Sequence, residues 1–292
     1  VSILKEIENM FNFPEQLIYK ISDFIDIGVD WVLSNMRGIF DFIRLIILNI
    51  FDGTEFLLSA IPWWAYLIIL FVAGWRLYSI KTGISLTLML FAIGMFGLWD
   101  MMIYTLVIVV ISVVVSILIG LPIGILMAKS KRLEKILKPI LDGMQTMPSF
   151  VYLIPAVMLF GIGKVPAVFA TTIYAIAPLI RLTYLGITNV NKEVVEAGLS
   201  FGSTPMQMLV KIELPQAVST IMTGVNQTTM MAMAMVVIAS MIGADGIGGE
   251  VLIAIRRLEV GRGIQAGLAI VFLAIILDRV MQGVVKKFER SV

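Results

Sequence analysis

The 292-residue sequence contains neither cysteine nor histidine. Their absence excludes disulfide-stapled folds, thiolate or imidazole metal centres, and cysteine or histidine nucleophiles. Charged residues are also scarce, at 14% of the chain, whereas an ordinary soluble domain has about a quarter. With a net charge of only +2, the chain lacks the basic excess that is typical of nucleic-acid-binding domains, and we expect no nucleic-acid partner.

Hydrophobic residues, by contrast, make up 59% of the chain. A soluble globule of this composition would have too little polar surface to cover itself, so lipid must solvate much of the chain. We therefore predict an all-α, polytopic membrane protein. Residues 1–60 hold nine acidic and four basic residues, while residues 61–292 hold eleven and eighteen, which indicates that the two parts lie in different surroundings.

Residues 1–60 are predicted to lie in the membrane interface. Asp41, Arg44 and Asp52 interrupt the apolar stretches of this segment before they reach the roughly 20 residues that a crossing requires. Apolar residues recur at helical spacing opposite acidic ones, a pattern typical of amphipathic helices that lie along a membrane surface. The acidic start does not fit a signal peptide, which begins with a basic region.

The rest of the chain is predicted to cross the membrane seven times, with two accessory helices in residues 61–99 and a core in residues 100–285. The predicted spans are 62–78, 84–99, 103–127, 148–160, 165–185, 219–242 and 264–284. The fourth is short and interrupted by Pro155. Proline at membrane depth frees backbone carbonyls, which is tolerated where they line a cavity or where neighbouring groups bond them.

The basic residues predict the orientation of these spans. Alternating the spans puts fourteen Lys and Arg on one side, including five in residues 129–138, and eight on the other. The richer side is cytoplasmic by the positive-inside rule, so residues 1–60 lie outside and the tail 286–292 lies in the cytoplasm of a bacterial cell. The 129–138 cluster also offers positive charge to anionic membrane lipids.

Residues 188–216 predict a helix–turn–helix knob on the cytoplasmic side. Glu193 and Glu196 share one face of a short helix, and Ala197 and Gly198 leave its backbone open to close approach. Gly202 permits a sharp bend. An ordinary interfacial loop is the alternative interpretation.

A second short helix is predicted after the bend. Ser203 or Thr204 caps it, and Pro205 occupies its first position, where a missing N–H costs nothing. Apolar residues at 206, 209 and 212 give this helix a docking face, and Pro215 is predicted to end it before the chain returns to the membrane.

The knob resembles a known signature. Permease subunits of type I ABC importers share the pattern Glu-Ala-Ala, three residues, Gly, nine residues, Ile-x-Leu-Pro. The matching positions here are Glu196, Ala197, Gly202, Ile212, Leu214 and Pro215, and the one departure is Gly198 in place of the second alanine. Residues 141–155 and 243–249 and the acidic N-terminal extension are similar, more narrowly, to the glycine betaine/proline betaine permeases.

This resemblance implies a function and a set of partners. It implies the transmembrane permease subunit of an ATP-driven importer of glycine betaine or a related osmoprotectant, with a five-helix core used as a homodimer. A permease for another small solute, such as methionine, is the alternative within the same class, and a polytopic scaffold or an intramembrane enzyme is a more distant one. The implied partners are a CBS-bearing cytoplasmic ATPase and an extracytoplasmic substrate-binding protein.

The resemblance also assigns the knob its role as the coupling helix, seated in a groove of the ATPase. The residues implied in this coupling are Glu193, Glu196, Ala197, Gly198, Gly202, Pro205, Ile212, Leu214 and Pro215. The sequence has no Gly-x4-Gly-Lys-Ser/Thr phosphate-binding motif. We therefore expect no enzyme activity and no bound cofactor in this chain, with ATP and Mg²⁺ held by the partner.

Two groups of residues are candidates for the solute pathway. The aromatic rings of Phe150 and Tyr152 are suited to a quaternary ammonium group, although packing against a neighbouring subunit is the alternative. The sixth span contains a polar and methionine-rich stretch. This stretch indicates either a gate that lines the pathway or hydrogen bonding between helices. The candidate gate residues are Gln227, Thr228, Met230, Met231 and Met233. The glycine run 243–249 is expected to be an outward gate loop or a flexible connector.

Overall fold

The computed structural model describes residues 21–289, and all regular structure in that range is helical. The all-α prediction is therefore confirmed. Four of the described helices are long and apolar enough to cross a membrane, and the number rises to six if each of two bent helix pairs is one span. The chain divides into two compact units, residues 1–43 and residues 44–292.

The first unit contains the start of one long helix, α2 (Ile21–Ser59). The sequence predicted several amphipathic helices within 1–60, but α2 runs unbroken through 39 residues of that range. Phe24, Ile27 and Trp31 of the first unit are exposed, as an amphipathic helix in a membrane interface requires. The part of the prediction that concerns residues 1–20 lies outside the described residues.

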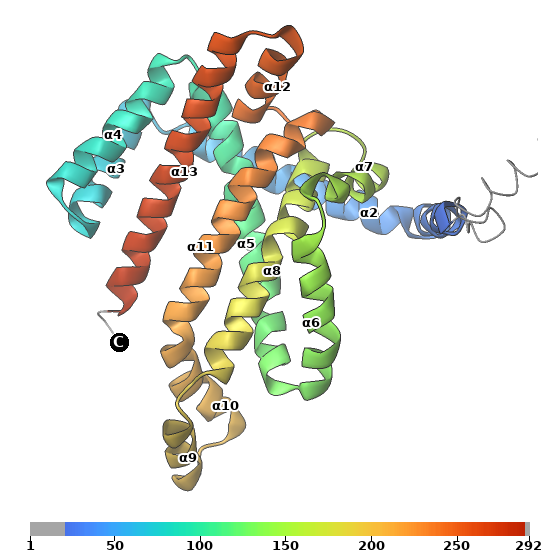
Figure 1. The fold of residues 1–292 in the computed structure, drawn as a ribbon, viewed down its shortest axis with the longest axis vertical. Helices are drawn as coiled ribbons and strands as arrows, with labels where there is room; N and C mark the ends of the chain where they lie inside the picture. The colour runs from blue at the N-terminus through green and yellow to red at the C-terminus, as the bar shows by residue number, and fades with distance from the viewer. Residues whose placement is uncertain (1–20, 290–292) are drawn as a thin grey trace, which may run out of the picture. The chain divides into compact units, whose positions relative to one another are not determined.

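The second unit is a helical bundle (Figure 1). Its helices are α3 (Trp63–Leu77), α4 (Ile80–Met95), α5 (Trp99–Lys129), α6 (Lys131–Thr146), α7 (Leu153–Phe160), α8 (Lys164–Thr188), α9 (Lys192–Ser200), α10 (Pro205–Met208), α11 (Leu214–Ala239), α12 (Ile247–Arg257) and α13 (Val260–Glu289). Short 3₁₀ turns lie at Ser149–Tyr152 and Ser240–Ile242, and a π turn lies at Leu209–Glu213.

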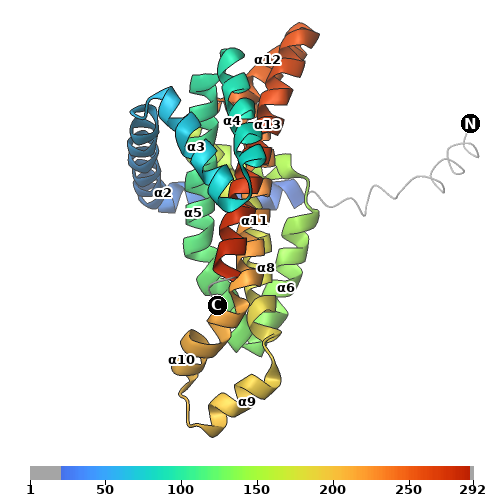
Figure 2. The same ribbon diagram turned by 90° about the vertical axis from the view of Figure 1, so that its left-hand side faces the viewer.

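Helix α8 packs against both α5 and α11, and the three helices run side by side through the bundle (Figures 1 and 2). Glycines let these helices approach closely, because a Cβ at Gly124 of α5 would lie 2.6 Å from the Cβ of Thr183 on α8. Likewise, a Cβ at Gly224 of α11 would lie 3.3 Å from the Cα of Leu179 on α8. Small residues at such contacts allow the van der Waals packing on which helix association in lipid depends.

Helices α3 and α4 form a hairpin beside α13 (Figure 2). Gly74 and Gly83 face each other so closely that a Cβ at position 74 would lie 2.8 Å from the Cα of Gly83. The two helices have 15 and 16 residues. At 1.5 Å per residue each is about 23 Å long, which is shorter than the roughly 30 Å of a hydrocarbon core.

The fourth predicted span differs from its prediction. The sequence analysis left residues 129–138 between the third and fourth spans, but α6 begins at Lys131, and Leu137, Leu141 and Met144 on one side of it pack against α5 and α8. The chain then breaks at Pro148, and the segment up to Phe160 is bent by 111° relative to α6. Pro155 does not interrupt α7, because it lies in the first turn, where its missing N–H is not needed.

Candidate functional site

The knob projects from one end of the bundle, where α9 and α10 extend beyond α5, α8 and α11 (Figures 1 and 2). Helix α9 is its first arm, and the side chain of Asn191 caps this helix by accepting a hydrogen bond of 2.9 Å from the backbone N–H of Glu193. Glu193, Glu196 and Ala197 are exposed, whereas Gly198 is buried. The two predicted glutamates are therefore open to solvent, and Glu196 lines a cavity between α9 and the end of α5.

The bend and the start of the second arm follow the sequence prediction. Gly202 has a φ of +76°, in the left-handed region that favours glycine. Thr204, rather than Ser203, caps α10: its hydroxyl accepts from the backbone N–H of Gln207 at 3.3 Å, while the Gln207 side chain accepts from the Thr204 N–H at 2.9 Å. Pro205 occupies the first helical position, as predicted.

The two arms meet at Gly198. A Cβ at this position would lie 2.6 Å from Cδ1 of Ile212 and 2.8 Å from Cε of Met208. Met208 is buried by this contact. The glycine that departs from the signature pattern thus allows the second arm to lie closer to α9 than an alanine would.

The apolar face of the knob differs from its prediction. Of positions 206, 209 and 212, only Met206 is strongly exposed, at 68%. Leu209 packs on the core cluster around Ala217, and Ile212 packs on Gly198. The second arm is not a free helix, because the side that carries Leu209 and Ile212 packs against other residues of the chain. The exposed apolar residues, here called the knob face, are Val194, Leu199, Phe201, Met206 and Val210.

The prediction that Pro215 ends the second arm is wrong. The arm passes through the π turn Leu209–Glu213 directly into α11, and Pro215 lies in the first turn of that helix. The backbone N–H of Leu214 bonds the carbonyl of Leu209, five residues back, so the helix widens just before the proline. A widened turn accommodates a residue that has no N–H to donate.

Glu213, which the sequence prediction passed over, is buried in this π turn and forms an ion pair with Lys129, the last residue of α5. A carboxylate at the variable position of the Ile-x-Leu-Pro motif was visible in the sequence. Its partner was not, because the two residues are 84 positions apart.

The candidate gate residues of α11 do not all share one environment. Gln227 and Met230 are exposed, Met231 is half-buried, and Thr228 and Met233 are buried. The exposed ones continue a row along one side of the helix that comprises Gln216, Thr223, Gln227, Met230 and Ala234. Polar side chains on a membrane-spanning helix usually face protein or a water-filled path. This row therefore marks a side of α11 that something other than lipid covers.

The two aromatic candidates also differ from each other. Phe150 is exposed, whereas Tyr152 is buried. The hydroxyl of Tyr152 donates to the carbonyl of Met144 at 2.5 Å, and its ring meets Tyr174 edge-on with centroids 5.6 Å apart. Tyr152 thus braces the break between α6 and α7, and of the two rings only Phe150 has an open face.

A polar contact between α11 and α13 was missed in the sequence prediction. Asn226 donates to Asp278 at 3.1 Å, and Gln282 donates to the same carboxylate at 2.8 Å. Asp278 lies within the candidate span Val260–Lys286. A lone acid in an apolar run was the signal that could have pointed to it, because intramembrane carboxylates are rare and need partners.

The glycine run 243–249 is a packed turn and not a free connector. Gly243 and Gly246 have φ values of +79° and +114°. A Cβ at Gly248 would lie 2.8 Å from the Cα of Val237, and the backbone N–H of Ile247 donates to the Thr105 hydroxyl at 3.0 Å. These contacts fix the start of α12 at the end of the bundle opposite the knob (Figure 1).

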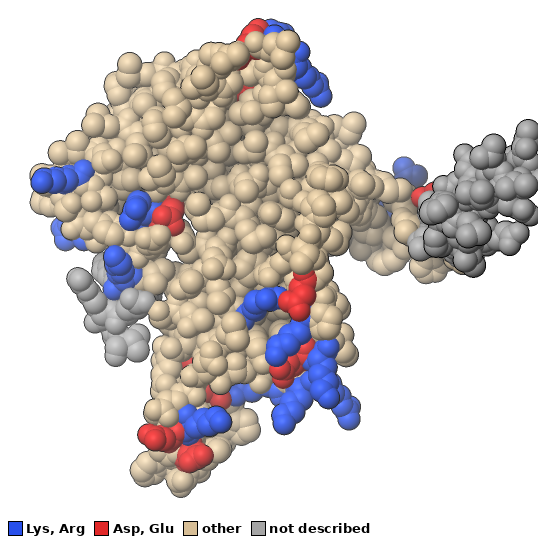
Figure 3. Space-filling model, viewed as in Figure 1, with Lys and Arg blue, Asp and Glu red and all other residues tan. Residues whose placement is uncertain are grey.

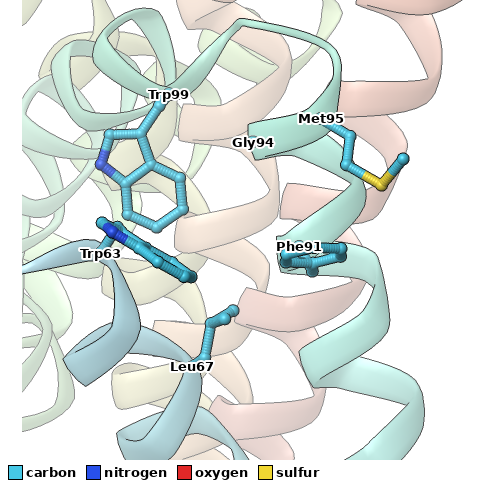
Figure 4. Close-up of a pocket in the computed structure, with 6 residues that line it drawn as sticks. All are labelled: Trp63, Leu67, Phe91, Gly94, Met95 and Trp99. Atoms are coloured by element: carbon cyan, nitrogen blue, oxygen red, sulfur yellow. The ribbon is translucent and has the colours of Figure 1, made fainter.

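One pocket, of about 380 Å³, lies between α3, α4 and the start of α5 (Figure 4). Figure 4 shows Trp63 and Trp99 on one side of it and Phe91 on the other. The lining consists of Trp63, Leu67, Phe91, Gly94, Met95 and Trp99. Because none of these side chains is charged, the pocket suits an apolar group better than a zwitterion. Within the described residues, no group of three or more acidic side chains could hold a metal ion.

A family comparison covers much of the chain. Residues 120–292 match the family described as the inner membrane component of binding-protein-dependent transport systems. The chain is 46% identical to the glycine betaine/proline betaine transport system permease protein ProW of Escherichia coli K12, over 94% of this chain and 78% of that protein. It is also 46% identical to the glycine betaine/carnitine transport permease protein GbuB of Listeria monocytogenes, over 91% of this chain and 96% of that one.

The fold has a counterpart among solved structures. An inward-facing structure of the MetNI methionine ABC transporter matches with a TM-score of 0.58, over 66% of this chain and 94% of that chain. The sequence identity is 20%, so this likeness concerns the fold alone.

Proposed function

Because the chain belongs to the family of inner membrane components of binding-protein-dependent transport systems, and within it to the glycine betaine/proline betaine permeases, we propose that it forms the membrane path of an ATP-driven importer for these solutes and related osmoprotectants. It is a multi-pass protein of the inner membrane. The ATPase is a separate subunit, and a binding protein delivers the solute. The knob with its exposed face is the observation that carries this proposal.

The membrane topology that we propose has seven spans. They are α3, α4, α5, the bent pair α6–α7, α8, α11 and α13, and the last five form the core. The knob end is cytoplasmic and residues 1–60 lie outside. This orientation follows the excess of basic residues on one side of the predicted spans. On the face that Figure 3 displays, charged side chains gather around α6 and the knob, at the left beside α3, α4 and the end of α13, and at the tip of α12.

The knob face is the proposed docking surface for the ATPase. Phe201 is 91% exposed, and α9 carries the exposed Glu193 and Glu196 together with the exposed Val194 and Leu199. An exposed apolar cluster with a charged rim is the usual anatomy of a protein interface. In keeping with the resemblance, we expect the ATPase to be of the CBS-bearing kind. ATP binding draws its subunits together, and the knobs of two permease copies move with them.

The solute path is proposed to run between the two copies of this chain. The exposed row of α11, with Gln227 and Met230, and the open ring of Phe150 supply polar and aromatic surfaces to such a path. A quaternary ammonium group binds aromatic faces, and methionine adapts its shape as a gate opens and closes. Membrane lipids cover the remaining apolar surface.

The binding protein is proposed to meet the tip formed by α12 and the start of α13. Leu258 is 86% exposed and has a φ of +56°, the one positive φ among the described non-glycine residues. Arg256 and Arg257 precede it, and Glu259, which pairs with Arg257 at 3.9 Å, follows it. The buried Glu250 holds the tip through a hydrogen-bonded ion pair with Arg262 at 2.6 Å. The exposed Leu258 beside two arginines suits a surface of the binding protein that has an apolar pocket bordered by acidic residues.

Reconstitution tests the proposed function. The chain, its ATPase and its binding protein are placed in lipid vesicles, and ATP-driven accumulation of labelled glycine betaine is compared with that of labelled methionine. We expect accumulation of glycine betaine only. Uptake of methionine, or no uptake of either solute by an assembled complex, contradicts the proposal.

A further inference from the structure

The ion pair between Lys129 and Glu213 lies where the knob joins the bundle. Glu213 is only 7% exposed, and its carboxylate accepts a hydrogen bond from Nζ of Lys129. Because the desolvation of a buried carboxylate is unfavourable unless a partner compensates it, the π turn and the end of α5 are held together at this point.

The two arms of the knob are attached to the bundle in different ways. The second arm continues into α11 through the π turn that contains Glu213. The first arm, α9, is separated from the ion pair by a cavity of about 280 Å³, whose lining includes Lys129 and Glu213 on one side and Val195 and Glu196 on the other. The ion pair therefore links α5 to the second arm at the edge of the cavity, whereas α9 lines the cavity from its own side.

The position of Lys129 on α5 is favourable in itself. Lys129 is the last residue of this helix, where a cation interacts favourably with the carbonyl end of the helix dipole. Ser130 then accepts a hydrogen bond from the backbone N–H of Leu133 and starts α6 directly. A displacement of Lys129 consequently moves the whole corner between α5 and α6.

We propose that the Lys129–Glu213 ion pair transmits the displacement of the knob to the α5–α6 corner, with both residues acting as positioning residues for coupling. This inference rests on the proposed function. Helix α11 follows the knob because the chain is continuous. Ile125 and Ala128 of α5 pack on the same cluster as Leu209 and Leu214, and the ion pair is the charged contact that holds the end of α5 to the π turn. Loss of the pair weakens the hold of the knob on the α5–α6 corner, so ATP is hydrolysed with less opening and closing of the path.

The test measures solute imported per ATP hydrolysed in vesicles that contain the complete complex. K129M and E213Q each break the pair, and the charge swap K129E/E213K restores it with reversed polarity. We expect each single variant to bind the ATPase normally but to lower the ratio about tenfold, within the range of typical coupling effects. The lowering is larger for K129M, which leaves a buried carboxylate without its cation. K129R and the swap recover most of the ratio.

A matched control is available on α6. Lys138 pairs with Glu134 at 2.6 Å within that helix, and Glu134 also accepts a hydrogen bond from the hydroxyl of Tyr184 on α8. This pair is more exposed than Lys129–Glu213 and includes no residue of the knob. K138M therefore removes a Lys–Glu ion pair from the same end of the bundle without removing the contact between α5 and the knob, and we expect the wild-type ratio.

A crosslinked variant distinguishes an effect on coupling from an effect on folding. The chain has no cysteine, so K129C/E213C carries the only two thiols in the permease. We expect this variant to be uncoupled when reduced and to regain coupling when a short bis-maleimide joins the two thiols. An unchanged ratio in the single variants, or a crosslinked complex that stays uncoupled, overturns the proposal. If the wild-type complex imports no glycine betaine, the proposed function itself fails, which is a different result.

Discussion

Gly198 on α9 and Ile212 on the second arm lie in such close contact that a Cβ at position 198 would come within 2.6 Å of Cδ1 of Ile212. The nearest obstacles to such a Cβ are the mobile ends of side chains and not backbone atoms. This distinction decides which substitutions the knob tolerates.

We expect G198A to keep near-normal transport, because the atoms that must shift are the far ends of the flexible Ile212 and Met208 side chains, which can rotate away. G198L should separate the arms and lower uptake by tenfold or more, since overpacking typically costs about 1–3 kcal/mol. The measurement is ATP-driven uptake together with retention of the ATPase on the purified permease. Equal activity of both variants would show that the arms do not need this contact.

At Gly202 the backbone itself is the constraint. Its φ of +76° is unfavourable for a side chain by roughly 1–2 kcal/mol, and most of all for a β-branched one, whereas asparagine tolerates the left-handed region. We expect G202V to lose coupling and G202N to retain a large part of it. No other atom lies within 4 Å of a Cβ at this position, so a steric clash does not confound the comparison. Identical behaviour of the two variants contradicts a role for the bend.

Substitution of Phe201 tests the knob face. A charge at this 91% exposed ring should weaken binding of the ATPase by about 2 kcal/mol or more if the ring is a central contact. F201D should therefore lose ATPase binding, while F201Y keeps the ring and most of the affinity. Affinity is measured between purified permease in detergent and the ATPase, with thermal unfolding as a control for folding. Normal binding of the ATPase by F201D would show that the interface does not include Phe201.

The contact between Asn226 and Asp278 predicts a stability effect. Interhelical polar contacts in membranes average about 0.6 kcal/mol and reach about 1.7 kcal/mol. D278N keeps a carbonyl acceptor for both amides and should lower the free energy of unfolding only slightly. D278L leaves the amides of Asn226 and Gln282 without this acceptor and should lower it by about 1–2 kcal/mol. Denaturant titration in detergent measures the free energy of unfolding of the two variants. An unchanged value for D278L would mean that the amides find other partners.

The two arginines beside Leu258 predict salt-sensitive binding of the solute receptor. R256E/R257E should weaken the stimulation of ATP hydrolysis by the binding protein and reduce its dependence on salt, because exposed interface charges act mainly on the rate of association. Hydrolysis without the binding protein should stay unchanged. A receptor affinity equal to that of the wild type would exclude this tip as the contact.

The sequence alone determined those features that depend on a residue and its neighbours within one or two turns. The apolar content required membrane helices, Gly202 required a bend, and Thr204 with Pro205 started a helix. Each follows from backbone conformation, capping or hydrophobicity, which are local properties.

Tertiary structure decided which side of each helix is free. Ile212 has the spacing of an exposed docking residue but packs on Gly198, and Tyr152 was a candidate for the path but is buried at the break after α6. The pairs Lys129–Glu213 and Asn226–Asp278 join residues 84 and 52 positions apart. Burial and ion pairing depend on what packs against a side chain, and no local rule specifies a neighbour that distant.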